Sequence, residues 1–211
     1  MSILHINAST RGSESQSYTV ADLFVSELRS KVGLTVDQYN LFEEKLPEFS
    51  KFAVGAKLAV FAGTEATKDQ QEAWKGIRKV FDRFAAADTY VFNVPLWNNG
   101  MPYVLKQFID IVTQPGWSFG LDMEKGYFGL MKEKRALVVH AGGVYYEGIP
   151  SGFGSDFNTP YLNDWFKLIG IEDVEHIYVS PTVLNSDFAS TKAQAETSAR
   201  ALAAKWATNY K

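Results

Sequence analysis

Residues 3–17 read ILHINASTRGSESQS, an apolar run that breaks directly into a loop of hydroxyl-bearing side chains. An apolar run of this length, bounded by turn-forming residues, is typical of a buried β-strand that feeds a loop. Apolar side chains then recur with helical spacing over residues 18–33, which predicts a helix with Ser17 as its N-cap and Gly33 as its stop. The chain is therefore predicted to begin as strand, loop, helix.

The same alternation of strands and helices continues to the C-terminus. Further strands are predicted at 34–39, 89–94, 135–140 and 174–179, and further helices at 68–87, 103–112, 158–170 (capped by Asn158 or Thr159) and 190–210. The segments 42–57, 114–129 and 141–157 are predicted to be irregular, with a short helix following the first. The pattern predicts an α/β fold in one domain, 1–211, with a five-stranded doubly wound parallel sheet and helices on both faces.

The composition excludes several classes of chemistry. The 211 residues contain no cysteine, so a dithiol, a thiolate metal site or a cysteine nucleophile is excluded and redox chemistry would need a bound cofactor. Three scattered histidines do not predict a metal site. The formal charge of -3 with interspersed signs, and the lack of any apolar window of roughly 18 residues, predict no nucleic-acid or membrane partner and a cytoplasmic protein.

The loop after the first strand suits a phosphate group. In open doubly wound sheets, ligands bind beyond the carboxyl ends of the strands, where the strand order reverses. This loop has neither a G-x-G-x-x-G dinucleotide motif nor a Gly-Lys-Ser/Thr sequence, but it leads into a helix N-terminus, which favours an anion. The candidate phosphate ligands are Ser9, Arg11, Ser15, Gln16 and Ser17. A solvated serine-rich turn with an N-cap explains the same residues equally well.

Two further loops at the same edge suit a planar ring with polar edges. After the third strand come Pro95, Leu96, Trp97, Asn98 and Asn99, a flat side chain beside amide side chains. After the fourth come His140, Ala141, Gly142 and Gly143, whose glycine amides can approach a ring without obstruction. Taken singly, each loop is explained by packing or by a turn. Their meeting at one sheet edge favours a ligand site.

These residues resemble the FMN-dependent NADH:quinone oxidoreductases and azoreductases, which have the flavodoxin-like fold. The similarity covers nearly the whole chain. It is most specific in residues 95–98 (PLWN), 105–110 (LKQFID), 142–148 (GGVYYEG), 159–162 (TPYL) and 169–171 (IGI).

The resemblance implies tightly bound FMN, NADH or NADPH as donor, and quinones or azo compounds as acceptors in a ping-pong reaction. It implies that Ser9 and residues 15–17 hold the phosphate, that residues 96–99 frame the isoalloxazine, and that residues 140–143 contact its pyrimidine edge. It also implies a homodimer with the active site at the subunit interface, where Phe119 of one chain closes the pocket of the other.

The sequence departs from the family pattern at two places. His140-Ala141 stands where the family commonly has Ser or Ala followed by Arg, and Asn99 stands where Phe is common. His140 could donate a hydrogen bond or carry charge near the flavin, or be a satisfied histidine at a strand end. Tyr145 could line the substrate pocket, donate a proton to the acceptor, or merely pack. No side-chain acid or base is strictly required.

Two alternative functions compete with this hypothesis. A non-catalytic flavodoxin-type electron carrier would share the fold, but such carriers usually have a strongly acidic docking face, and a net charge of -3 with mixed signs speaks against one. A hydrolase using the serine loop would need a G-x-S-x-G elbow or a metal cluster, and the sequence contains neither.

Overall fold

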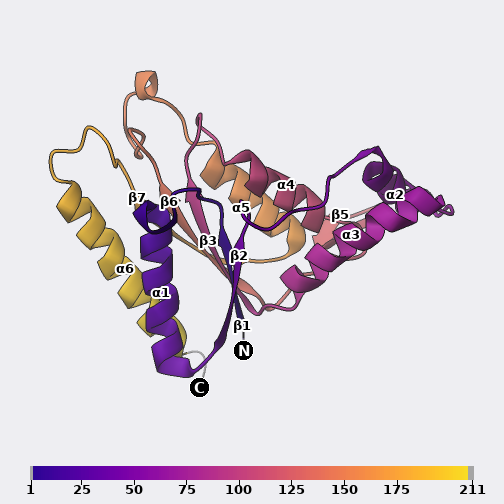
Figure 1. Cartoon of the computed structure of the whole chain (residues 1–211), viewed down its shortest axis with the longest axis horizontal. Coiled ribbons are helices and arrows are strands. Elements are labelled where there is room, and N and C mark those ends of the chain that lie inside the picture. The colour runs from indigo at the N-terminus through magenta and orange to yellow at the C-terminus, as the bar shows by residue number, and fades with distance from the viewer. Residues whose placement is uncertain (1, 209–211) are drawn as a thin grey trace.

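A computed structural model describes residues 2–208 and shows a parallel sheet between two layers of helices (Figure 1). The strands are β1 (Ser2–Asn7), β2 (Thr35–Asn40), β3 (Thr89–Pro95), β6 (Arg135–Ala141) and β7 (Asp173–Val179). They pair in the order β2-β1-β3-β6-β7, and every pairing is parallel. The predicted five-stranded doubly wound α/β fold is confirmed, with the order reversing between β1 and β3.

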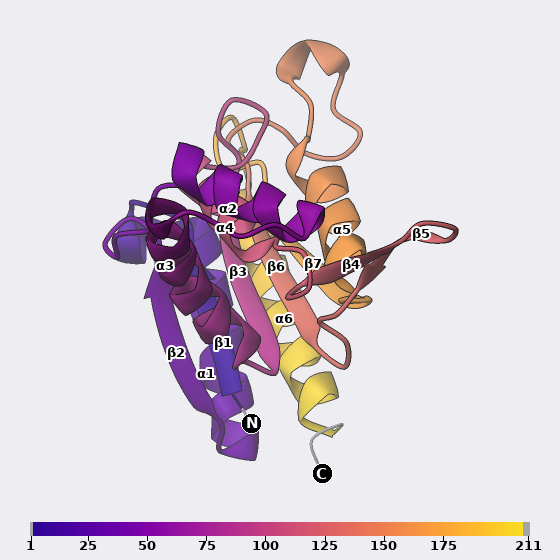
Figure 2. The same cartoon turned by 90° about the vertical axis from the view of Figure 1, so that its right-hand side faces the viewer.

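Helices cover both faces of this sheet. One face carries α1 (Gln16–Val32) and α6 (Phe188–Thr208), and the other carries α3 (Lys68–Ala85), α4 (Tyr103–Val112) and α5 (Asn158–Ile169), as Figures 1 and 2 show. A hydrophobic core lies on each face of the sheet, and each strand contributes to both because its side chains alternate between the faces. Val91 of β3 packs toward α1 and α6, while Tyr90 and Phe92 pack toward α3, α4 and α5. Full burial of each such side chain stabilises the fold by roughly 1.5–3 kcal/mol.

Element boundaries agree closely with the sequence pattern. All five predicted strands lie within one residue of the observed ends, and the predicted helix 103–112 coincides with α4. The predicted C-terminal helix begins two residues earlier, at Phe188, and its predicted end, Tyr210, lies outside the described residues. Among residues 2–208, no helix combines the length and the apolarity that crossing a membrane requires.

The structure corrects two predicted helix caps. Ser15, not Ser17, caps α1: its backbone is extended and its Oγ accepts a hydrogen bond from the backbone N–H three residues on, at 3.3 Å. Ser17 already lies in the first turn, with its side chain buried. On α5, Asp156 Oδ1 accepts hydrogen bonds from the backbone N–H groups of Asn158 and Thr159 at 2.7 and 3.1 Å, so neither of these two is the cap.

Two segments predicted to be irregular contain regular structure. Residues 42–57 include the start of α2 (Lys51–Ala62), which Ser50 caps and which packs on α3. Residues 114–129 include a two-stranded antiparallel hairpin, β4 (Phe119–Asp122) and β5 (Gly126–Gly129), which projects from the body of the molecule in Figure 2.

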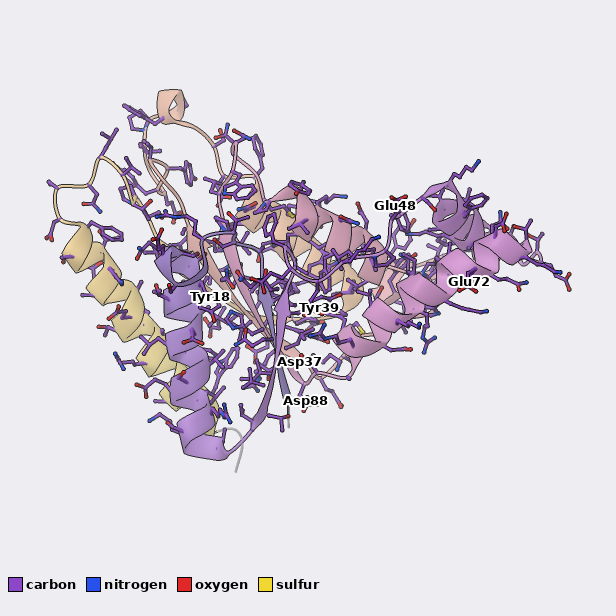
Figure 3. The ribbon with its side chains drawn as sticks, in the orientation of Figure 1. Tyr18, Asp37, Tyr39, Glu48, Glu72 and Asp88 are labelled. Atoms are coloured by element: carbon purple, nitrogen blue, oxygen red, sulfur yellow. The ribbon has the colours of Figure 1, made fainter. Side chains whose placement is uncertain are left out.

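Edge strand β2 is held by a cation from the helical layer. Arg83 of α3 binds the Asp37 carboxylate with two hydrogen bonds of 2.7 Å, and its guanidinium lies 3.9 Å from the Tyr39 ring centre. Figure 3 places both Asp37 and Tyr39 on β2. This bidentate pair fixes α3 against the sheet edge and leaves a charged rather than apolar edge strand.

Candidate functional site

The loops that follow β1, β3, β6 and β7 meet at the carboxyl edge of the sheet (Figure 1). Between them lies a cavity of about 270 Å³, called here the central cavity. From the predicted cofactor ligands it brings together Ser9, Arg11, Ser15, Gln16, Pro95, Leu96, Trp97, Ala141 and Gly143, and it adds Thr10, Thr182 and Val183. The predicted loops therefore do converge on one cavity.

The α1 end of the central cavity is suited to an anion. The Ser15 and Ser17 hydroxyls lie 3.2 Å apart in the first turn of α1, where free backbone amides and the helix dipole favour negative charge. The amide group of Gln16 faces the cavity with its Oε1 unpartnered within residues 2–208, and its Nε2 makes only a 3.5 Å contact with the Glu14 carbonyl oxygen. Ser17, although predicted as a ligand, does not itself line the cavity.

A buried polar network supports the loop after β1. His5 Nε2 donates to Asn93 Oδ1 at 3.0 Å, Asn93 Nδ2 donates to Asn7 Oδ1 at 2.7 Å, and the same oxygen accepts from the Ser9 backbone N–H at 2.9 Å. Burial lowers the pKa of His5 to about 4, so the ring is neutral and its stack on Tyr18, 5.4 Å between ring centres, is an uncharged contact. The network fixes Ser9 at the cavity wall.

The loop after β3 is a tight turn with unusual backbone geometry. Trp97 and Gly100 exchange two backbone hydrogen bonds of 2.8 and 2.9 Å, and Asn98 and Asn99 between them have φ of 50° and 65°. Asparagine tolerates this left-handed conformation better than most residues. Neither asparagine side chain lines the central cavity. The Asn99 carbonyl oxygen instead accepts a hydrogen bond from the Phe157 N–H at 3.0 Å, which ties this loop to the segment before α5.

The paired glycines after β6 form an open cradle. Their carbonyl oxygens accept hydrogen bonds from Thr182 and Val183 N–H groups at 2.8–2.9 Å, whereas the N–H groups of Gly142 and Gly143 donate to nothing within residues 2–208. A Cβ on Gly142 would lie 2.9 Å from the Tyr145 carbonyl oxygen. A Cβ on Gly143 would meet only Val183 Cγ2, at 3.9 Å, and would otherwise occupy space in the cavity. Free donors beside open space fit the polar edge of a flavin.

His140 is a neutral member of a hydrogen-bonded chain. Its Nε2 lies 2.9 Å from His176 Nδ1, and His176 Nε2 lies 2.7 Å from Asn163 Oδ1. Burial, reinforced by His176, lowers the pKa of His140 to about 3. Its ring also stacks on Tyr178, with 4.8 Å between ring centres. A ring this deeply buried stays unprotonated at neutral pH, which favours the hydrogen-bonding alternative for His140 over a charged one.

A narrow second cavity, about 20 Å³ and called here the neck, adjoins the central cavity. Both share Leu96 and Ala141, and the neck is also lined by His140, Gly142, Tyr145, Asp156, Asn158, Tyr178 and Ser180. Asn158 is only 1% exposed, yet neither its Nδ2 nor its Oδ1 has a partner within residues 2–208. An unpaired buried amide costs about 1–3 kcal/mol. Its place in the neck makes it a candidate ligand-binding group, where the sequence had indicated only a cap.

Phe119 lies away from these cavities. It is 5% exposed and packs on β4 between Phe61 and Tyr127, with ring centres 6.5 and 5.6 Å away. The role of Phe119 at the pocket of a second chain stays a prediction, and within its own chain the side chain is buried. Tyr127 and Phe128 of the same hairpin are the exposed aromatic side chains.

Comparison with known proteins agrees with this geometry. Residues 1–204 match a protein family described by its flavodoxin-like fold. The chain is 42% identical over 186 residues (88% of this chain, 91% of the relative) to an FMN-dependent NADH:quinone oxidoreductase of Ruegeria pomeroyi. It is 40% identical over 205 residues (95% and 97%) to a protein of the same name from Nitratidesulfovibrio vulgaris strain DP4. An FMN-dependent NADH-azoreductase from Bacillus anthracis, solved in complex with FMN, superposes with a TM-score of 0.84 at 25% identity, covering 98% of this chain and 99% of that one.

Proposed function

The chain belongs to the family of FMN-dependent NADH:quinone oxidoreductases, and from this premise we propose that it passes two electrons from NADH to quinones or azo compounds. Bound FMN would accept a hydride from NADH and then reduce the acceptor, with donor and acceptor occupying the same place in turn. The observation that carries the proposal is the convergence of free amide donors and unpartnered amide side chains on two adjoining cavities, the central cavity and the neck, at the carboxyl edge.

The protein's part in this reaction is to bind and orient. The N-terminus of α1, with Ser9, Ser15 and Gln16, would hold the phosphate. The Gly142 and Gly143 N–H groups would donate to the pyrimidine edge of the ring, where fixed donors favour negative charge.

Trp97 and Leu96 would cover the ring from the β3 side and exclude water from it. Neutral His140 would offer a hydrogen bond rather than a charge. Tyr145, which lines the neck, would border the place where donor and acceptor bind.

We propose that the chain works as a homodimer in the cytoplasm, where NADH is available to it. Exposed apolar side chains gather on α2 and on the hairpin: Phe52, Val54, Leu58, Val60, Phe61, Leu121, Met123, Tyr127, Phe128 and Leu130. Contacts of Phe119 with Phe61 and Tyr127 join the two elements. Monomers rarely expose apolar patches beyond a few hundred Å². Because α2 lies toward the carboxyl edge in Figure 2, pairing through this patch would bring the two sites near the interface.

Sedimentation equilibrium tests the dimer directly. We expect the FMN-loaded protein to give twice the monomer mass, and a Leu58→Glu variant to shift toward the monomer because it places a charge in the proposed interface. A wild-type protein that sediments as a monomer at micromolar concentration would contradict the proposal.

The activity is tested with protein loaded with FMN. Under anaerobic conditions, NADH should bleach the flavin absorbance, and menadione or an azo dye should restore it, with turnover in the steady state. Bleaching only by a separate reductase would instead favour an electron carrier. A protein that binds no FMN at micromolar concentration would overturn the proposed function.

Replacing Gln16 with glutamate is expected to weaken FMN binding about tenfold. The change is isosteric, and it sets a carboxylate beside the proposed phosphate position, where like charges about 4 Å apart repel by about 2–4 kcal/mol at an effective dielectric constant near 20–40. Because Gln16 is only partly buried, solvent and salt screen part of this repulsion. Stability should not fall, because an acid in the first turn of a helix is favourable. Flavin titration measures the affinity. Gln71→Glu makes the same change in the first turns of α3 and should leave FMN affinity unchanged; equal affinities in both variants would remove Gln16 from the phosphate site.

A further inference from the structure

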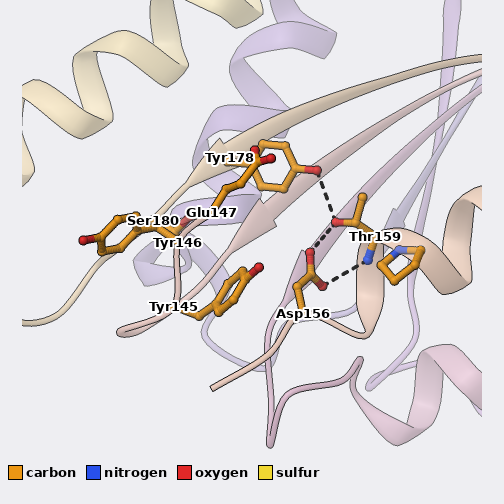
Figure 4. A pocket seen from close by; sticks show the side chains of 8 residues that line it. Tyr145, Tyr146, Glu147, Asp156, Thr159, Tyr178 and Ser180 are labelled. Atoms are coloured by element: carbon orange, nitrogen blue, oxygen red, sulfur yellow. Dashed lines mark hydrogen bonds between the residues drawn. The ribbon is translucent and has the colours of Figure 1, made fainter. Parts of the chain in front are cut away.

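A third cavity, called here the tyrosine cavity, opens beyond the neck (Figure 4). It has a volume of about 390 Å³ and is lined by Tyr145, Tyr146, Glu147, Asp156, Thr159, Pro160, Tyr178 and Ser180. Tyr145, Asp156, Tyr178 and Ser180 also line the neck, which itself shares Leu96 and Ala141 with the central cavity. The three cavities thus follow one another around the loop after β6.

The walls of the tyrosine cavity have the chemistry of an aromatic site. The Tyr178 ring forms one wall and stacks on buried His140 with an interplanar angle of 11°. Its hydroxyl lies 3.2 Å from Thr159 Oγ1, which donates to Asp156 Oδ2 at 2.6 Å (Figure 4). This chain of contacts holds the wall in place, while Tyr146 and Tyr178 remain 43% and 45% exposed and available for stacking.

The charge at the tyrosine cavity is negative. Glu147 and Asp156 line it, and both carboxylates add to the rise that burial produces in the pKa of Tyr178, which places both within electrostatic range of that ring. Its lining includes no lysine or arginine among residues 2–208. The histidine behind the wall, His140, is neutral. An anionic group entering the cavity would therefore be desolvated without a counter-charge.

Asn158 connects this cavity to the redox site. Both polar atoms of its buried side chain are unpartnered and lie at the neck, between the tyrosine cavity and the central cavity. A polar group that enters the neck beside Asn158 can satisfy this amide, which has no partner within residues 2–208. At about 20 Å³ the neck has room for one small group, and its shared lining residues place the tyrosine cavity next to the redox site.

We propose that the tyrosine cavity binds the far aryl group of the electron acceptor and selects neutral or cationic aryl groups over sulfonated or carboxylated ones. This inference rests on the proposed oxidoreductase function and names its acceptor class. The diphosphate of a nicotinamide dinucleotide is excluded from the cavity by the same carboxylates, so the cavity serves the acceptor and not the donor.

The test uses two azo dyes that differ in one substituent of opposite charge, on the FMN-loaded enzyme at fixed NADH. Both carry the 4-(dimethylamino)azobenzene scaffold, one with a 4'-trimethylammonium group and the other with a 4'-sulfonate. We expect kcat/KM to favour the cationic dye at least tenfold, with most of the difference in KM, and dye titration without NADH to show the same order of Kd. The preference should shrink in 0.5 M salt, because Glu147 is exposed and its field is screened.

Charge-neutral variants separate the effect of the cavity on the dye preference from the intrinsic reactivity of the two dyes. Glu147→Gln should lower the cation-to-anion ratio at least threefold, and intrinsic reactivity cancels when this ratio is compared with that of the wild type. Glu172→Gln removes the same charge just before β7, at the opposite edge of the sheet, and should leave the ratio unchanged. An unaltered ratio in Glu147→Gln, or equal wild-type kcat/KM for both dyes, overturns the inference. Reduction of neutral menadione by wild-type enzyme reports separately on the proposed function; its absence in FMN-loaded protein would overturn that function instead.

Discussion

Replacing Gly143 with valine is expected to expel FMN while the protein stays folded. The added side chain meets no protein atom closer than Val183 Cγ2, at 3.9 Å from the Cβ position, so it occupies the central cavity rather than the core. A ring displaced from the N–H groups of Gly142 and Gly143 loses both donors and its stacking surface. We expect at least a hundredfold weaker binding, about 2.7 kcal/mol, measured by flavin titration.

The control for this variant is Gly152→Val, in the same long loop. Gly152 has no atom within 4 Å of its Cβ position, and it lines none of the three cavities. It should keep both FMN and activity. In the absence of flavin, both variants should melt within a few degrees of the wild type, because neither side chain enters a packed region. Retention of FMN by Gly143→Val would remove this loop from the cofactor site.

The sequence predicts those elements whose burial pattern is set by their own residues. β3 is apolar except at Thr89 and Asn93 because both of its faces are covered, and α3 has an apolar stripe facing the sheet, so both elements are predictable without coordinates. α2 lacks such a stripe: it exposes Phe52, Leu58 and Phe61 and contains Gly55, so periodicity could not identify it. In the hairpin, β5 begins and ends with glycine and β4 contains Gly120, so the sequence of both strands resembles that of a loop.

Part of the candidate site could likewise be predicted from the sequence, and part of it could not. Three loops were identified from their residue types, because hydroxyl side chains before a helix N-terminus and paired glycines each indicate a binding loop from the local sequence alone. The fourth loop, with Thr182 and Val183, was missed although the parallel topology places the carboxyl end of β7 at the same edge. The contact of His140 with His176 depends on the register of β6 with β7, and the orphaned amide of Asn158 depends on what surrounds it. Neither could be read from sequence spacing.

Replacing Gly129 with alanine is expected to destabilise the fold without removing the cofactor site. The added Cβ would overlap the backbone of Ile169 and Gly170, where β5 crosses the end of α5. Neither segment can retreat easily: Met131 N–H donates to the Ile169 carbonyl oxygen at 2.8 Å, and Gly170 holds a φ of 92° that ends the helix. Overpacking of backbone costs about 3 kcal/mol, which lowers the melting temperature by roughly 6–12 °C in a chain of this size.

Thermal melts of FMN-free protein measure this loss, and Gly76→Ala is the matched control. Gly76 lies within α3, where a Cβ would make only an ordinary 3.6 Å contact with Pro47, and alanine should raise stability by roughly 0.5–1 kcal/mol because it favours the helix. FMN affinity of Gly129→Ala, measured well below its melting temperature, should stay near the wild-type value, since Gly129 lines none of the three cavities at the carboxyl edge. A melting temperature equal to the wild type would show that β5 does not cross α5 as closely as these backbone positions require.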